Sequence, residues 1–196
     1  MGTEVSVWLW HDDPVAGRLL VDTVFEEAER INQLMSTYIE ESRISEINRD
    51  AAAGPVVAGD ELFSLIQRSL DISMLTRGAF DITYDSVGQY YDFRRRQRPD
   101  TATVGKERDR IDYRLVELDA AAGTVHFLAD GVRINLGGIA KGYAVERGVD
   151  ILKSRGVTSA IVTAGGDSRL LGDRRGQPWG IGIRDPREDG EGAISV

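Results

Sequence analysis

The chain has 196 residues, 41% of them hydrophobic and 29% charged, a composition typical of a soluble globular chain with one domain. Its formal net charge of -8 argues against an electrostatic nucleic-acid binder, because phosphate contacts need clustered Lys and Arg. The sequence lacks cysteine, which excludes disulfides, thiolate catalysis and Cys-ligated metal. No apolar run approaches the ~20 residues of a membrane span. The one basic run, residues 92–99, is predicted to be a solvated loop.

The first half of the chain predicts one strand and then three helices. Residues 4–10 are β-rich and partly alternating, which is typical of a strand. A helix is expected to begin at Asp13-Pro14, because aspartate caps helices and proline suits their first position. Ser42–Asn48 predicts a short helix. Asp60 is expected to cap a third helix, which stops at Arg77-Gly78.

The centre predicts a β meander that leads into a glycine turn. Its three strands are expected at residues 113–118, 124–128 and 132–136, with turns around Gly123 and Gly131.

The last part predicts one helix and several strands. The helix carries small and apolar residues at four-residue spacing from Ala140 to Leu152 and ends at Gly156. Residues 159–163 predict a buried strand, residues 170–183 a hairpin, and residues 193–196 the start of a strand that lacks its partners. The fold class expected is α+β, with an antiparallel sheet flanked by helices in a single domain over residues 1–196.

The segment Asn135–Ala144 has the architecture of an anion site. It ends a predicted strand, turns on Gly137-Gly138 and opens a helix with Lys141 in its first turn. Free backbone N–H groups and the positive end of the helix dipole attract phosphate, and glycine lets a ligand approach the main chain. A structural turn with an exposed lysine is the alternative for this segment taken alone.

Three other segments could carry chemistry. Tyr38, in Met35–Ile39, follows a helix and could stack on an aromatic ring or simply pack. Gly78–Thr83 leaves a helix with small, aromatic and acidic residues, and Asp81 could instead cap the next turn. Ala164–Asp167 could form a backbone nest for phosphate or a strand-to-strand turn.

Taken together and in this order, these segments resemble the ApbE-type FAD:protein FMN transferases. The resemblance spans nearly the whole chain. It is carried by Met1-Gly2-Thr3, Met35–Tyr38 with Ser42, Ile44, Ile47 and Asn48, Gly78–Thr83, Leu136–Ala144, Ala164–Asp167 and Trp179–Pro186.

The resemblance implies a set of flavin contacts. Met1, Tyr38 and the segment Ala79-Phe80-Asp81 would line the FAD site. Asn135 and Lys141 would contact the dinucleotide, and Gly138 would offer a carbonyl to Mg²⁺. Asn135 stands where many family members have aspartate, so a polar contact is kept and a charge is lost.

The implied reaction is the Mg²⁺-dependent transfer of FMN from FAD to a Thr or Ser of an acceptor flavoprotein, with release of AMP. Two alternatives stay open: an FAD pyrophosphatase that gives FMN and AMP, and a non-catalytic FAD-binding module. The resemblance also implies a periplasmic or membrane-anchored protein whose leader is absent from this chain, and a cytoplasmic location stays open.

Members of the family continue past the region of Trp179 with further metal and flavin ligands. We therefore expect the chain to be C-terminally truncated and nearly silent in catalysis, since Mg²⁺ needs several oxygen ligands.

Overall fold

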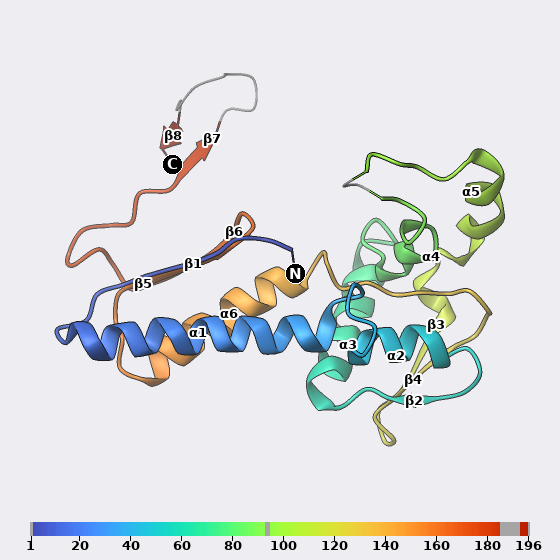
Figure 1. Cartoon of the computed structure of the whole chain (residues 1–196), viewed down its shortest axis with the longest axis horizontal. Helices are drawn as coiled ribbons and strands as arrows, with labels where there is room; N and C mark the ends of the chain where they lie inside the picture. Colours follow the sequence, from blue (N-terminus) through green and yellow to red (C-terminus); the bar gives the residue numbers. More distant parts are fainter. Residues whose placement is uncertain (1, 93–94, 185–192, 196) are drawn as a thin grey trace. The chain divides into compact units, whose positions relative to one another are not determined.

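The computed structural model describes residues 2–92, 95–184 and 193–195 (Figure 1). Its internal contacts divide the chain into two compact units. One consists of Glu29–Lys141; the other combines Gly2–Ala28 with Gly142–Val196. Two helices, α1 (Pro14–Met35) and α6 (Ala140–Ser154), supply residues to both units. The α+β prediction is confirmed.

The unit that contains both chain ends is built on a three-stranded antiparallel sheet. Its strands are β1 (Val5–Leu9), β5 (Ala160–Ala164) and β6 (Asp167–Leu171), in the order β1-β5-β6. This sheet lies along α1 and α6 in Figure 1, and apolar side chains fill the layer between them. The buried members of this core are Val24, Val145, Val149, Leu152, Val157, Ala160, Val162 and Ala164.

The predicted hairpin over residues 170–183 is wrong. A turn does form at Arg175-Gly176, where Arg174 and Gln177 exchange backbone hydrogen bonds. However, β6 pairs with β5, because Gly165-Gly166 supplies a two-residue connection immediately before β6. Further on, β7 (Gly182–Arg184) pairs with β8 (Ala193–Ser195), so the predicted last strand has a partner.

The other unit contains short helices and a small sheet. The sheet has the order β2-β4-β3 and is antiparallel throughout. The elements are α2 (Arg43–Asp50), β2 (Val56–Val57), α3 (Asp60–Leu75), η1 (Ile82–Tyr84), α4 (Asp85–Gly88), α5 (Thr101–Glu107), η2 (Arg108–Arg110), η3 (Tyr113–Leu115), β3 (Val116–Asp119) and β4 (Thr124–Phe127).

Helix starts follow the capping pattern in two of three predicted cases. The Asp13 carboxylate accepts from the N–H groups of Val15 and Ala16, and the Ser42 hydroxyl accepts from Ser45 N–H. Asp60 is not a cap. It is the first residue of α3, where a carboxylate is favoured by the helix dipole, and the cap position is Gly59 with a φ of 81°.

The predicted β meander exists only in part. β4 and the end of the first strand form, but Tyr113–Leu115 is a 3₁₀ turn that begins after an Asp112 cap. Residues 132–136 form no strand. Two of their N–H groups donate to side chains: that of Ile134 to Asn48 Oδ1 at 2.8 Å and that of Arg133 to Ser86 Oγ at 3.0 Å. Asn135 N–H donates to the backbone carbonyl of Ile82 at 2.9 Å. Two side chains and one carbonyl of η1 therefore take the place of a neighbouring strand.

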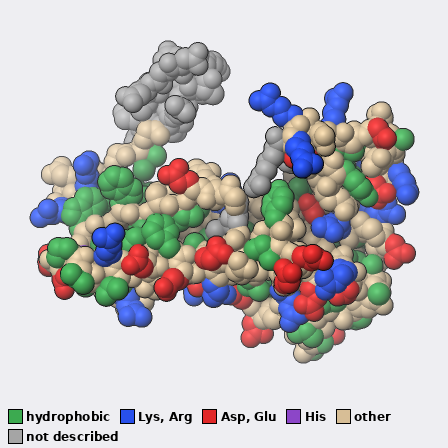
Figure 2. Space-filling model, in the orientation of Figure 1, with side chains coloured by type: hydrophobic (Ala, Val, Ile, Leu, Met, Phe, Trp, Pro, Cys, Tyr) green, Lys and Arg blue, Asp and Glu red, His purple; other side chains and the backbone are tan. Residues whose placement is uncertain are grey.

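The surface carries charges of both signs. Figure 2 shows acidic and basic side chains interspersed on the visible face of the unit that holds α5. Arg95, Arg96 and Arg98 of the predicted solvated loop are exposed, and residues 93–94 lie outside the described residues. None of the helices in the described part combines the length and apolar character that a membrane span requires.

Candidate functional site

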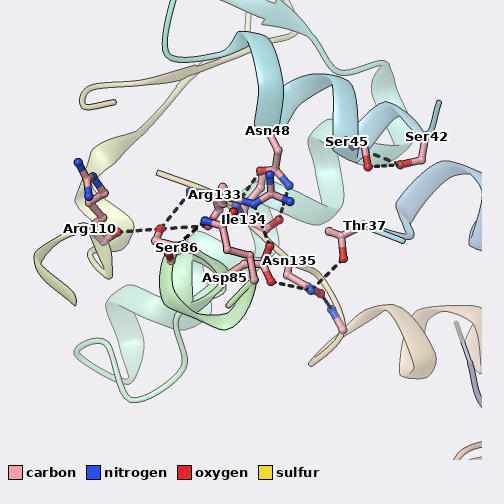
Figure 3. Close-up of polar contacts among 12 residues, drawn as sticks. Thr37, Ser42, Ser45, Asn48, Asp85, Ser86, Arg110, Arg133, Ile134 and Asn135 are labelled. Carbon is pink, nitrogen blue, oxygen red and sulfur yellow. Dashed lines mark hydrogen bonds and ion pairs between the residues drawn. The ribbon is translucent and has the colours of Figure 1, made fainter. Parts of the chain in front are cut away.

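The Asn135 side chain lies at the centre of the candidate site, within the unit formed by Glu29–Lys141 (Figure 3). Its amide Nδ2 donates to Asp85 Oδ1 at 3.1 Å and to Thr37 Oγ1 at 3.2 Å. Its Oδ1 accepts from Gly137 N–H at 2.8 Å. One side chain therefore connects the end of α1, the start of α4 and the glycine turn.

Gly137 and Gly138 lie where side chains approach the main chain closely. Neither has a positive φ, so the backbone conformation alone does not require glycine. A Cβ at Gly137 would lie 3.0 Å from Asn135 Oδ1, and one at Gly138 would lie 3.1 Å from Phe80 Cε2. The two glycines are thus explained by space beside an amide and an aromatic ring.

The expectation of free backbone N–H groups at this turn needs correction. Gly137 N–H donates to Asn135, and the N–H groups of Ile139 and Ala140 both donate to Leu136 O. Within the described residues, Gly138 N–H is the group of this turn that keeps no such partner. Most backbone N–H groups of the turn therefore donate within the turn itself, two of them to the carbonyl of buried Leu136.

Two tyrosines lie near this turn. Tyr38 is 85% exposed, and Tyr84 is partly exposed with its hydroxyl facing Gly137. Burial, followed by the charges of Asp85 and Tyr38, raises the pKa of Tyr84 from 10.0 to about 12. Tyr84 is consequently a neutral phenol at physiological pH, able to donate a hydrogen bond.

The predicted flavin segment Ala79-Phe80-Asp81 divides into different environments. Ala79 is exposed, and the Phe80 ring approaches Gly138. Asp81 Oδ1 accepts from Thr83 N–H at 2.8 Å, and Oδ2 accepts from Tyr113 N–H at 2.9 Å. Asp81 therefore caps the next turn, as the capping alternative proposed, and its flavin contact stays a prediction.

The remaining predicted residues lie at the edges of the site. Lys141 is in the first turn of α6, directly after the glycine turn, and is half-buried. Met1 lies outside the described residues. The structure thus brings Phe80, Asn135 and Gly138 together, with Tyr38 next to Thr37.

Comparison with known proteins identifies the family. The model of the ApbE family matches residues 1–196. The chain belongs to the ApbE family. The crystal structure of the ApbE protein from Thermotoga maritima matches it with a TM-score of 0.89 at 31% identity, over 100% of this chain and 64% of that one. For the flavin transferase ApbE from Vibrio cholerae the TM-score is 0.87 at 25% identity, over 100% and 64%.

Curated relatives agree with this membership. The FAD:protein FMN transferase of Vibrio cholerae is 28% identical over 200 residues, which cover 96% of this chain and 58% of the relative. That of Klebsiella pneumoniae is 29% identical over 197 residues, which cover 99% and 59%. This ApbE-family chain therefore spans less than two thirds of the length of each of these relatives.

The acidic side chains of this ApbE-family chain do not gather into a metal site in the part that the structure describes. Among the described residues, no group of three or more His, Asp or Glu side chains is arranged to hold a metal ion. The carboxylates of Asp81 and Asp85, which lie in the candidate site, accept hydrogen bonds from other protein groups. These described residues do not fit the near-octahedral oxygen set that Mg²⁺ demands.

Two residues of the site were not found by sequence reasoning: Asp85, which binds Asn135, and Tyr84, which lies at the glycine turn. Thr37, which also binds Asn135, belongs to the predicted segment Met35–Ile39. Asp85 follows Thr83-Tyr84 at the end of the motif Gly78–Thr83, so its position beside that motif was the available signal.

Proposed function

We propose that this chain carries the FAD-binding part of an FAD:protein FMN transferase. The observation that carries the proposal is the match of the ApbE family model to residues 1–196, together with a glycine turn flanked by an aromatic ring and an amide. A flat aromatic group and a pyrophosphate are the two parts of FAD, and exposed aromatic rings and a lysine beside an accessible main chain suit them.

Different residues of the site would bind the ring and the pyrophosphate of FAD. Tyr38 and Phe80 would bind the isoalloxazine ring by stacking and edge contacts. Lys141 would attract the pyrophosphate, aided by the positive end of α6 and by Gly138 N–H. Tyr84 would donate a hydrogen bond as a neutral phenol, since its pKa is about 12.

The reaction proposed is a phosphoryl-type transfer. A hydroxyl oxygen of an acceptor Thr or Ser bonds to the FMN-side phosphorus of FAD, and the bond from that phosphorus to the bridging oxygen breaks. The electron pair of that bond leaves with AMP, and the hydroxyl proton passes to water. Developing negative charge on the phosphoryl oxygens would be met by Lys141 and the oriented N–H group of Gly138. The partner is an acceptor flavoprotein, and the location proposed is the periplasm or the outer face of a membrane.

The test uses the chain, FAD, a series of Mg²⁺ concentrations and a peptide bearing the target threonine. The full-length Vibrio cholerae relative serves as the positive control. FMN on the peptide together with an equal amount of AMP would support the proposal, at a rate expected to be far below that of the control. FMN and AMP without a peptide adduct would favour the pyrophosphatase, and bound FAD without turnover at any Mg²⁺ concentration would favour the binding module.

A further inference from the structure

Asp85 is a buried carboxylate to which the proposed function gives no part. It is 5% exposed and is the first residue of α4. Its Oδ2 accepts from Arg133 Nε at 3.3 Å, and its Oδ1 accepts from Asn135 Nδ2 at 3.1 Å. A charge this deeply buried is costly unless it is paired and hydrogen-bonded, and these two partners meet that need.

The chemistry of the pair fixes the direction of the hydrogen bonds. An ionised carboxylate only accepts, whereas an amide has one accepting oxygen and one donating nitrogen. Because Asp85 accepts from Nδ2, the Asn135 oxygen must face the other way, toward Gly137 N–H. Thr37 Oγ1 receives the second Nδ2 hydrogen and fixes the amide plane further (Figure 3).

We propose that Asp85 is a positioning residue that holds the glycine turn through Asn135. Asp85 accepts from Arg133 and from Asn135, and Asn135 in turn accepts from Gly137 N–H; we call this connected set of hydrogen bonds the relay. In the part of the chain that the structure describes, Asp85 makes no hydrogen bond to Gly137 itself, so its effect on the turn passes through the Asn135 amide. The consequence for flavin binding rests on the proposed function; the consequence for the turn does not.

The relay makes an unusual prediction for substitutions. Asp85→Asn removes the charge and leaves one accepting oxygen at position 85, for which the donors of Arg133 and Asn135 must compete. Asn135→Asp places two carboxylates where a donor and an acceptor met, about 3 Å apart. The double variant, D85N with N135D, satisfies all three links again. In it the new amide at 85 accepts from Arg133 and donates to the new carboxylate at 135, which accepts from Gly137 N–H.

The first measurement is hydrogen exchange of the Gly137 amide by NMR, without flavin. Both single variants should speed this exchange about ten-fold or more relative to wild type, and the double variant should return it to within about three-fold. The amide of Val125 in β4, the central strand of the same unit, is the internal reference, because general loss of stability in that unit would speed its exchange too. Equal acceleration at both amides, or no acceleration at Gly137 in Asp85→Asn, would overturn the proposal.

The second measurement is FAD affinity by fluorescence titration at a fixed salt concentration. Each single variant should weaken binding about ten-fold, and the double variant should recover most of that loss. Asp71→Asn and Gln33→Glu make the same chemical changes at exposed positions of α3 and α1 and should leave affinity unchanged. A double variant no better than the worse single variant would contradict the relay.

The two readouts separate the two claims. If wild type binds no FAD but the Gly137 exchange pattern appears, the proposed function fails and the relay stands. If wild type binds FAD and the exchange pattern is absent, the relay fails and the proposed function stands.

Discussion

The molecule contains two glycine pairs, and they are required for different physical reasons. Gly165 and Gly166 connect β5 and β6 with φ angles of 55° and 99°, a conformation that L side chains rarely adopt. Gly137 and Gly138 have no positive φ, and there a Cβ would meet Asn135 and Phe80. The same dipeptide thus marks a hairpin in one unit and an approach path to the main chain in the other.

The two turns also differ in what holds the backbone beside them. The hairpin belongs to a sheet whose core is apolar and whose backbone pairs strand to strand. The other turn follows residues 132–136, whose backbone is held by buried polar side chains such as Asn48 and Ser86. A segment held by specific side chains should respond strongly to polar substitutions of nearly equal size.

The largest expected effect is therefore on Asn48. Asn48→Leu leaves the N–H and C=O of Ile134 unpaired in the core, so it should lower the free energy of unfolding by about 2–4 kcal/mol. Urea denaturation followed by circular dichroism measures this. Ser69→Ala is the matched control, because buried Ser69 only adds a bond to Leu65 O, a carbonyl inside α3. If both variants lost the same stability, the side-chain pairing of residues 132–136 would be unimportant.

The next effect is on flavin affinity. Tyr38→Ala should weaken FAD binding by about 1–3 kcal/mol, the range for aromatic stacking on a base. Stability should hardly change, since Tyr38 is 85% exposed. Tyr90→Ala removes a partly exposed tyrosine from the same unit and should leave the titration curve unchanged. An unaltered dissociation constant in Tyr38→Ala would remove this ring from the site.

A smaller pair of effects tests the two glycine turns against each other. Gly166→Ala should destabilise the chain by about 1–2 kcal/mol through its backbone strain, with FAD affinity retained. Gly138→Ala should weaken FAD binding and retain stability, because its methyl group would push the Phe80 ring and cover the exposed main chain. Thermal unfolding and FAD titration of both variants make the comparison. Equal changes in stability and in FAD affinity for the two variants would mean that glycine is required for the same reason in both turns.

The smallest effect concerns Tyr84 and pH. Because the pKa of Tyr84 in the folded chain is about 12, above the ordinary value of 10.0, the phenol contributes stability that is complete below pH 10 and is lost as pH rises toward 12. Tyr84→Phe has no phenol to ionise. The difference in unfolding free energy between wild type and this variant should therefore shrink from pH 10 to pH 12. A difference that stays constant over that interval would show that the hydroxyl is not shielded.

Much of the fold was predictable from local patterns. The helices that begin after Asp13 and at Ser42, and the helix that ends at Gly156, follow from caps and apolar spacing. Residues 132–136 were not predictable as irregular, because their apolar pattern is that of a strand. Their partners in place of a neighbouring strand are the distant residues Asn48, Ile82 and Ser86.

The candidate site was predictable in its motifs but not in its polar links. Phe80, Asn135 and Gly138 were found from short motifs. Asp85 lies 3.1 Å from the Asn135 amide, and no sequence pattern joins positions 50 residues apart. The magnesium ligands stay a prediction that the described residues do not support.

The most direct test of the central claim is an NMR titration of the isotope-labelled chain with FAD. If the dinucleotide binds at the turn beside Asn135, the amide signals of Gly137, Gly138 and Ile139 should shift with a saturable dependence on FAD. Those of Gly165 and Gly166 should stay where they are. Shifts confined to the hairpin, or an unchanged Gly138 signal at saturating FAD, would contradict the account.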